Sequence, residues 1–299
     1  LHDSLYVVVG LAAGASDGKI AAYLWSDGKL HAAWSKHVGD HVCALTTVSG
    51  YVAAAIGHEV HTYAMEPHAL TFRRPWDCAF VSSCLASQGS TLVVGDAMHS
   101  LTVLTVAEDG RLSESARDLH PYWTSAVCVL DEEQQRYLGT DVAMNLFVAE
   151  RAKGTEPESP WSHVMRHAAA CHVGDLVNAI HTLPGGRVMY ATASGALGTL
   201  VHVPEPVARV LLCVQDAMIE VVPAPGDIPW ESWRTSRTDT RTEPPHHILD
   251  ADVLRFFVSN PSVRSPCLDK AGSLAQARDI PMAEMAEERI LHMLHALLS

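Results

Sequence analysis

Three residues of metal-binding type recur at every fourth position in one stretch of the chain, namely His163, His167 and Cys171. On an α-helix, side chains four positions apart share a face, and imidazole nitrogens with a thiolate form a sound zinc ligand set. The spacing therefore raises the hypothesis of a zinc enzyme, which metal analysis of the purified chain would test. The competing interpretation is a His-rich connector, because a Pro- and Glu-rich stretch (154–160) precedes these residues and an apolar β-type run (177–183) follows them.

Other sequence patterns that carry catalytic chemistry are scarce. The chain has no phosphate-binding loop and no G-x-G-x-x-G followed by a helix. A single G-x-S-x-G match occurs at 14–18, but a β-type run (19–25) follows it, whereas a nucleophile turn leads into a helix. Ser, His and Asp are plentiful, yet nothing in the sequence places three of them together as a catalytic triad. An acidic run (131–133) lies in an expected turn, where solvated carboxylates are the simpler interpretation. We therefore predict a non-catalytic protein that needs no cofactor.

Composition narrows the function classes further. The 299 residues are 48% hydrophobic and 18% charged, which provides enough apolar material for a sizeable core. The net charge of −13, from 21 basic and 34 acidic residues, repels a phosphate backbone and disfavours direct nucleic-acid binding. No apolar run reaches the roughly 18 residues that a membrane-spanning helix needs.

Cysteine usage and the first residues bear on the cellular setting. Seven cysteines, an odd number without a C-x-x-C pair, fit reduced thiols inside a cell better than a disulfide framework. The opening Leu1-His2-Asp3 includes an acid and no basic flank, so we expect no signal peptide. Because the chain starts without Met, we expect a fragment of a longer protein.

Short β-rich runs dominate the chain before residue 204. Gly-containing turn signals such as Asp27-Gly28 and Ser49-Gly50 separate these runs, which is the pattern of β-hairpins. An apolar run that ends in glycine recurs at spacings of 38 to 56 residues, and a four-stranded propeller blade is roughly 40–50 residues long. These glycines are Gly10, Gly57, Gly95, Gly139 and Gly195. The pattern predicts about five blades of a β-propeller, where a closed ring commonly has around seven; the alternative is a β-sandwich with accidental glycine spacing.

The hydrophobic period changes after Pro204. Apolar residues then follow the 3–4 spacing of an amphipathic helix; they are Val207, Val210, Leu211, Val214, Met218, Val221 and Val222. A second helix is expected to begin after Asp250 as N-cap, and a last one at Pro281, with acids in its early turns. The sequence therefore predicts a mainly β chain, a partial propeller followed by a small C-terminal α-helical domain.

Several longer segments resemble a known family in order and with similar gaps. They are LVVGDAMHSLTVL (92–104), SARDLHPYWTSAVCVLD (115–131), YLGTDVAMNLFV (137–148), HVGDLVNAI (172–180) and SWRTSRTDTRTEPPHHILDADVLRFF (232–257), together with YVVVG (6–10) and SDGKL (26–30). They resemble the large subunits of damaged-DNA-binding complexes, which are adaptors of cullin-RING ubiquitin ligases. The same superfamily contains a large polyadenylation-specificity subunit and a subunit of the splicing factor 3b complex.

The resemblance implies an architecture as well as a function. Family members have three seven-bladed propellers followed by helices, and this chain corresponds to the C-terminal part of the third propeller plus the helices. We accordingly predict C-terminal blades over residues 1–203 and a helical domain over 204–299. The first two propellers, including the one that holds the cullin, are expected to lie outside this sequence.

The resemblance also implies a binding site. In the family, substrate receptors insert a helical motif into a cleft between the first and third propellers. The matching motifs carry this cleft onto Met98, Trp123 and Asn178, with Ala97 and His99 in place of the Leu and Arg that usually flank the methionine. On the preceding strand the usual Met, Leu and Tyr are replaced by Val81, Ser83 and Cys84. We therefore expect a smaller, less aromatic pocket that has diverged together with its receptors.

The residue types suit such a site. Met adapts its shape, Trp supplies a large rigid surface, and the Asn178 amide could satisfy a polar backbone group of the inserted helix. Without the resemblance, packing between blades is the simpler interpretation of Trp123, because it sits in a turn that enters a strand.

The function implied is that of a non-catalytic scaffold in DNA repair and protein ubiquitination, nuclear and also cytoplasmic. The expected partners are WD-repeat substrate receptors through a helical motif, a cullin only through an upstream propeller, and a separate damaged-DNA-binding subunit. Neither direct DNA binding by this chain nor membrane association is expected. The alternative is an RNA-processing subunit, in polyadenylation or splicing, which the partners recovered from cells would distinguish.

Overall fold

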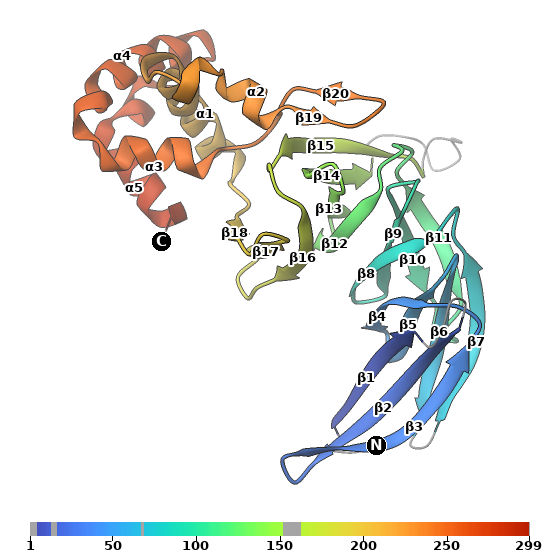
Figure 1. Ribbon diagram of the computed structural model, residues 1–299. Coiled ribbons are helices and arrows are strands. Elements are labelled where there is room, and N and C mark those ends of the chain that lie inside the picture. The colour runs from blue at the N-terminus through green and yellow to red at the C-terminus, as the bar shows by residue number, and fades with distance from the viewer. Residues whose placement is uncertain (1–4, 13–16, 67–68, 152–162, 299) are drawn as a thin grey trace. The chain divides into compact units, whose positions relative to one another are not determined.

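The computed structural model describes residues 5–12, 17–66, 69–151 and 163–298 of the chain, and Figure 1 shows their strands and helices. The chain divides into two compact units. A β unit takes most residues up to 198. A helical unit takes those from 199 onward, together with the short segments Ala170–His172 and Pro184–Val188.

Five successive sheets, each made of strands that follow one another in sequence, account for the β structure before residue 201 in the described ranges. The first two contain β1 (Leu5–Ala12), β2 (Gly18–Ser26), β3 (Lys29–Val38), then β4 (Val42–Val48), β5 (Tyr51–Ile56), β6 (Glu59–Glu66) and β7 (Ala69–Asp77). The next contain β8 (Ser82–Gln88), β9 (Thr91–Asp96), β10 (Leu101–Val106), β11 (Leu112–Arg117), then β12 (Thr124–Asp131), β13 (Arg136–Asp141), β14 (Asn145–Arg151) and β15 (Met165–His172). The fifth contains β16 (Val177–Thr182), β17 (Val188–Thr192) and β18 (Leu197–Leu200).

The order of strands is that of propeller blades. The first strands of successive sheets contact one another, β1 with β4, β4 with β8, β8 with β12 and β12 with β16. A radial series of sheets joined through their first strands is the propeller arrangement. The predicted fold class, mainly β with five blades and a few C-terminal helices, is confirmed.

Tight turns join neighbouring strands within a blade. Asp27 and Gly28 connect β2 to β3, Ser49 and Gly50 connect β4 to β5, and all four residues have positive φ. Positive φ at both central positions defines the type I′ turn, whose twist matches that of the paired strands. The turn signals in the sequence are therefore hairpin turns.

Hydrophobic cores lie between neighbouring blades. One core joins the second and third blades and contains Val48, Ala53, Val60, Leu92, Val94, Leu104 and Val106. The second strand of each of these blades is buried on both faces and so reads as an uninterrupted apolar run. The glycine that ends such a run marks a close approach: a Cβ at Gly95 would lie 2.3 Å from Cys84 Sγ, and one at Gly139 would lie 2.4 Å from the Phe147 ring.

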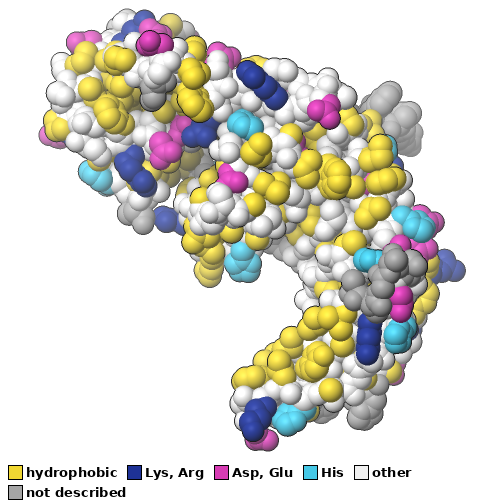
Figure 2. Space-filling model, viewed as in Figure 1, with side chains coloured by type: hydrophobic (Ala, Val, Ile, Leu, Met, Phe, Trp, Pro, Cys, Tyr) yellow, Lys and Arg dark blue, Asp and Glu magenta, His cyan; other side chains and the backbone are white. Residues whose placement is uncertain are grey.

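The first blade begins with an edge strand that is partly exposed. β1 is the edge of its three-stranded sheet, and Leu5, Val7 and Leu11 on it are exposed. Figure 2 shows hydrophobic side chains gathered over this blade, at the lower end of the view. An exposed apolar edge strand readily pairs with another strand.

The helical unit packs around a single apolar core. Its helices are α1 (Glu205–Val221), α2 (Trp230–Arg234), α3 (Ala251–Ser259), α4 (Pro261–Ala277) and α5 (Glu287–Leu298), with 3-10 turns at Pro225–Asp227 and Met282–Met285 and a short hairpin of β19 (Ser236–Arg237) and β20 (Thr242–Glu243). The predicted apolar face of α1 is the one that is buried, through Val210, Leu211, Val214 and Met218. The Asp250 side chain accepts a hydrogen bond from the Asp252 backbone N–H at 3.0 Å, which confirms the predicted N-cap of α3.

Two details of the helical prediction are wrong. The last helix does not begin at Pro281: a 3-10 turn comes first, Ala286 is extended, and α5 starts at Glu287. Helix α4 was not predicted. Its buried face consists of small residues four positions apart, Cys267, Ala271 and Ala275. Periodicity of large apolar residues, which predicts amphipathic helices, does not detect a face made of small residues.

Candidate functional site

The hypothetical zinc ligands do not lie on a helix. His167 and Cys171 belong to strand β15, and His163 comes shortly before it. Residues four apart on a strand are separated by roughly 13 Å, too far to share one ion. Burial also raises the pKa of the Cys171 thiol to about 11, which disfavours the thiolate that zinc requires. The zinc hypothesis for this triplet is therefore wrong, and the Pro- and Glu-rich stretch before it (154–160) lies outside the described residues.

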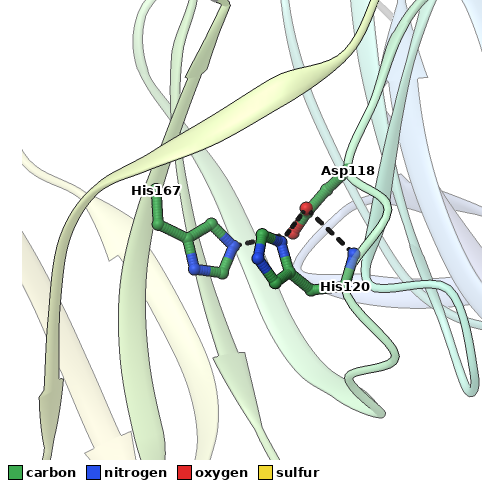
Figure 3. Close-up of side chains that lie close together, drawn as sticks. All are labelled: Asp118, His120 and His167. Carbon is green, nitrogen blue, oxygen red and sulfur yellow. Dashed lines mark hydrogen bonds and ion pairs between the residues drawn. The ribbon is translucent and has the colours of Figure 1, made fainter. Parts of the chain in front are cut away.

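His167 instead meets two residues from a different segment, Asp118 and His120 (Figure 3). The Asp118 carboxylate is fully buried, and its Oδ1 lies 2.5 Å from His120 Nδ1 while its Oδ2 lies 2.8 Å from His167 Nε2. Ser100 donates its hydroxyl to Oδ2 at 2.6 Å. An ionised carboxylate only accepts hydrogen bonds, so both ring nitrogens must carry protons toward it.

Opposing effects act on the pKa of Asp118. Burial raises this pKa, but the hydrogen bonds from His120 and His167 outweigh burial and hold it well below its usual range. The carboxylate is thus ionised at neutral pH. The two imidazoles stack with centroids 4.0 Å apart, and the His167 ring stacks in turn on Phe147 at 4.7 Å.

The geometry of these three side chains is that of a hydrogen-bonded network. Ligand atoms around a tetrahedral zinc lie roughly 3.3 Å apart, given zinc–ligand distances near 2.0 Å, whereas the Asp118–His pairs are at 2.5 and 2.8 Å. Each ring nitrogen also contacts a different oxygen of the carboxylate. The two rings are stacked, so the lone pairs in their planes do not point to one position where a metal ion could bind both. The network fixes the start of segment 118–123, which ends at Trp123.

Backbone hydrogen bonds connect the loops at this end of the blades into a continuous series. The donors and acceptors are Ala97 N to Val81 O (3.0 Å), Ser100 N to Tyr122 O (3.0 Å), Val142 N to Trp123 O (3.0 Å) and Val173 N to Met144 O (2.8 Å). Each of these loops is therefore hydrogen-bonded to the loop that precedes or follows it in this series. Such loops present their outward side chains from a rigid frame.

The turn that carries Met98 is built on a buried acid. Asp96 ends β9, and its Oδ1 accepts from the backbone N–H groups of Met98 at 2.7 Å and His99 at 3.0 Å. Its Oδ2 accepts from Phe80 N at 2.8 Å, which ties the turn to the loop before β8. The Met98 side chain is 52% exposed on this turn.

Large apolar side chains are exposed along these connected loops. We call them the loop surface, and they are Phe80, Val81, Met98, Leu119, Trp123, Val142 and Met144. Trp123 is 56% exposed, so packing between blades does not account for it. Exposed apolar clusters of this kind mark binding sites more often than isolated exposed residues do.

The other predicted site residues lie near this surface. Ala97 and His99 flank Met98 on the same turn. Asn178 is exposed on β16, next to Val177, whose carbonyl accepts from the Ser125 hydroxyl two residues beyond Trp123 at 2.7 Å. Of the substituted positions, Val81 is exposed, whereas Cys84 is packed against Gly95 and burial raises its pKa to about 12. The binding role of the predicted residues stays a prediction.

Sequence reasoning missed four members of the loop surface, namely Phe80, Leu119, Val142 and Met144. The sequence did contain one signal for such residues: an Asp ends the second strand of a blade, and the turn that follows it carries exposed apolar residues. Asp141 ends β13 as Asp96 ends β9, and it accepts from the Asn145 backbone N–H at 2.9 Å. The apolar residues in the second of these turns, Val142 and Met144, could have been found by this analogy.

The blades and the packed helices define a β-propeller protein with a C-terminal helical unit. The model of the family described as CPSF A subunit region matches residues 6–259. This match covers most of the chain, which therefore belongs to that family.

Curated relatives agree with the family. The chain is 27% identical to DNA damage-binding protein 1a of Arabidopsis thaliana over 260 residues, which are 81% of this chain and 24% of the relative. It is 27% identical to DNA damage-binding protein 1 of Drosophila melanogaster over 81% of this chain and 22% of the relative. The rice relative of the same name is 24% identical over 91% of this chain and 26% of its own length. The chain thus spans about a quarter of the length of these relatives. Among the described helices, none is long and apolar enough to cross a membrane.

Proposed function

We propose that the chain is part of a non-catalytic adaptor of cullin-RING ubiquitin ligases and docks substrate receptors on the loop surface. The observation that carries the proposal is the exposure of Met98 and Trp123 on loops that hydrogen bonds hold in place. A preorganised surface loses little conformational entropy on binding, which favours affinity. The names of the relatives support a role in a damaged-DNA-binding complex.

The occupant we propose is a helical motif with an apolar face, contributed by a WD-repeat receptor. Trp is among the residues that most often dominate binding energy, and Met adapts to differently shaped partners. Covering the exposed part of Trp123 would contribute roughly 3 kcal/mol at about 25 cal/mol per Å² of apolar area. Asn178, beside this surface, would satisfy polar groups at the end of the motif.

The remaining partners follow from the same proposal. The cullin would bind a part of the longer relatives that this sequence does not include, and damaged DNA would be bound by a separate subunit. The net charge of −13 disfavours DNA contact by this chain itself. The proposed location is the nucleus, and also the cytoplasm.

The alternative function is RNA processing, in polyadenylation or splicing. The description of the matching family as a CPSF A subunit region is the observation that favours it. Both functions use the fold as a scaffold, so the partner decides between them.

The test is affinity purification of the full-length product that carries this sequence, as wild type and as Trp123→Ala. Trp233→Ala is the matched control, because Trp233 is 53% exposed but belongs to the helical unit. We expect cullin and WD-repeat receptors with the wild type and with Trp233→Ala, and receptor binding about 30-fold weaker with Trp123→Ala.

Two results would contradict the proposal in different ways. Recovery of polyadenylation or splicing subunits in place of a cullin would establish the alternative function. Equal receptor recovery with Trp123→Ala and the wild type would leave the adaptor role standing and remove the loop surface as its docking site.

A further inference from the structure

Three arginines converge on a pocket at the other end of the blades. The pocket, of about 260 Å³, is lined by Arg73, Arg74, Asp109 and Arg111. Arg73 and Arg74 belong to β7, whereas Asp109 and Arg111 belong to the turn between β10 and β11 (Figure 1). The pocket therefore lies where the second blade meets the third.

A β-bulge explains why two consecutive arginines line one pocket. In the β6–β7 pairing, His61 lies opposite Pro75 and Tyr63 lies opposite Phe72, so Arg73 and Arg74 together oppose Thr62. A regular strand would direct consecutive side chains to opposite faces. An extra residue in one strand interrupts that alternation and re-aims side chains, and bulges are frequent next to functional sites for this reason.

The turn that carries Arg111 is hydrogen-bonded to the second blade. Thr62 is fully buried and donates its hydroxyl to the Gly110 carbonyl at 2.6 Å, and Tyr51 donates its hydroxyl to the Glu108 carbonyl at 2.6 Å. Gly110 has a φ of +82°, and a Cβ there would lie 2.7 Å from the Tyr51 ring. The turn thus fits against the second blade only with glycine at this position, and the fit brings Arg111 beside the bulge.

The positive charge of the pocket is poorly compensated. Arg111 and Asp109 approach to 3.9 Å, with side chains 63% and 64% exposed, a geometry that contributes little in water. Within the described ranges, Arg73 and Arg74 form no ion pair. A cluster of guanidinium groups is unusual in a chain of net charge −13, and its members repel one another unless an anion binds.

We propose that this pocket binds the phosphate group of a phosphorylated segment of a partner protein. Guanidinium groups bind phosphate oxygens with paired, charge-assisted hydrogen bonds, and a phosphoserine carries nearly two negative charges at neutral pH. The pocket has room for a phosphate group, and its arginines are exposed, so a phosphate on a partner segment can reach them. A nucleic acid would bring a long row of phosphates against an acidic protein, which disfavours it as the occupant.

The pocket is separate from the loop surface. Strand β10 runs from the turn that carries Met98 to the turn that carries Arg111, and its six residues span roughly 20 Å. Loss of phosphate binding would therefore not by itself impair docking on the loop surface, nor would loss of docking impair phosphate binding.

The experiment uses fluorescence anisotropy of a labelled peptide with one phosphoserine flanked by alanines, titrated with the full-length product that carries this sequence. We expect binding that inorganic phosphate competes away and that the unphosphorylated peptide does not show. Arg73→Gln/Arg74→Gln should weaken binding at least about tenfold, because two charge-assisted contacts are lost. Arg255→Gln, at an exposed arginine of α3, is the matched control and should change binding by less than about twofold.

A second variant tests the same pocket by gain of binding. Asp109→Asn removes the carboxylate that lines the pocket, so it should strengthen phosphopeptide binding about two- to fivefold. This variant keeps the proposal testable if the double arginine variant fails to fold. Binding should also be weaker at about pH 5.5 than at pH 7.5, since the second pKa of the phosphate is near 6.

Three results would overturn the proposal. The first is the absence of phosphopeptide binding at the highest concentration of folded wild-type protein, and the second is equal binding by the wild type and by a folded Arg73→Gln/Arg74→Gln variant. The third is an oligonucleotide that binds through the same arginines more tightly than the phosphopeptide does.

Discussion

Two buried aspartates, one in each unit, organise their surroundings in different ways. Asp118 in the β unit accepts hydrogen bonds from two imidazoles and a hydroxyl. Asp250 in the helical unit accepts from the Arg234 guanidinium at 2.8 Å and the Trp230 indole at 2.8 Å, and also caps α3. Burial raises the pKa of both aspartates, but the hydrogen bonds to their ionised carboxylates outweigh burial, so both pKa values are lowered.

The difference lies in the charge of the partners. A guanidinium is charged at every accessible pH, so Asp250 is neutralised whenever its carboxylate is ionised. Imidazoles can be neutral, so the charge of Asp118 is stabilised mainly by donated N–H and O–H groups. An ion pair that also caps a helix stabilises one unit, whereas a stacked, hydrogen-bonded network stabilises the loops of the other.

The largest effect is expected from breaking the ion pair. Asp250→Ala would leave the Arg234 guanidinium, the Trp230 N–H and the first turn of α3 without their acceptor. Removing one partner of a buried pair typically costs 3–5 kcal/mol, so we expect a loss of about 4 kcal/mol in the unfolding free energy of the helical unit. Urea unfolding monitored by Trp fluorescence measures it.

The control for this variant is Asp252→Ala, which removes an exposed acid from the same turn and should cost below about 1 kcal/mol. A loss for Asp250→Ala no greater than that of the control would show that the ion pair contributes no more than a surface charge.

A smaller effect is expected from the network in the β unit. Asp118→Asn keeps the size of the side chain but turns one acceptor into a donor, which then faces a ring N–H or the Ser100 hydroxyl. We expect a loss of about 2–3 kcal/mol, since charge-assisted hydrogen bonds are lost and a buried donor is left unpaired. Hydrogen exchange should show faster opening of segment 118–123 than in the exposed-site control Asp77→Asn. Equal exchange in the two variants would contradict the assigned role of the network.

Parts of this architecture could be predicted because their signals are local. Type I′ turn residues, the apolar second strands of the blades and the Asp250 cap each depend on a few neighbouring residues. The outer strands of the blades were harder to predict. β3 and β7 are mostly exposed and lack apolar alternation, so the sequence does not mark them as strands, and pairing with the inner strands is what forms them.

The candidate site shows the same limit. Met98 and Trp123 were found through a family resemblance, and their exposure depends on loops that long-range hydrogen bonds hold together. The cluster of Asp118, His120 and His167 joins positions 49 residues apart, so the helical spacing of His163, His167 and Cys171 pointed to the wrong partners. The spacing of residues in the sequence identifies a site only when the secondary structure assumed for them is correct.

Acid titration sharpens the comparison between the two aspartates. A carboxylate whose folded pKa is lowered contributes stability above its unfolded pKa, near 3.9, and loses it as pH falls through the folded pKa. Wild type should therefore lose stability as pH falls below about 5, and the full loss, about 1.4 kcal/mol for each unit by which the pKa of an aspartate is lowered, is reached only below the folded pKa. In Asp118→Asn the loss should be smaller, and what remains should include the Asp250 pair. Urea midpoints over this pH range measure both, and parallel curves for the two proteins would exclude a pKa shift at Asp118.

The smallest effect is expected at His167, where two contributions oppose each other. His167→Phe removes the hydrogen bond to Asp118 but keeps a ring that can stack on Phe147 and His120. It also removes Nδ1, a buried atom without a hydrogen-bond partner among the described residues, whose burial is itself unfavourable. We expect a net loss of only about 1 kcal/mol, against 3 kcal/mol or more for His167→Ala, which leaves a cavity. Thermal unfolding of the two variants separates the contributions. A loss for His167→Phe as large as that for His167→Ala would mean that the hydrogen bond to Asp118, rather than ring packing, holds this part of the blade together.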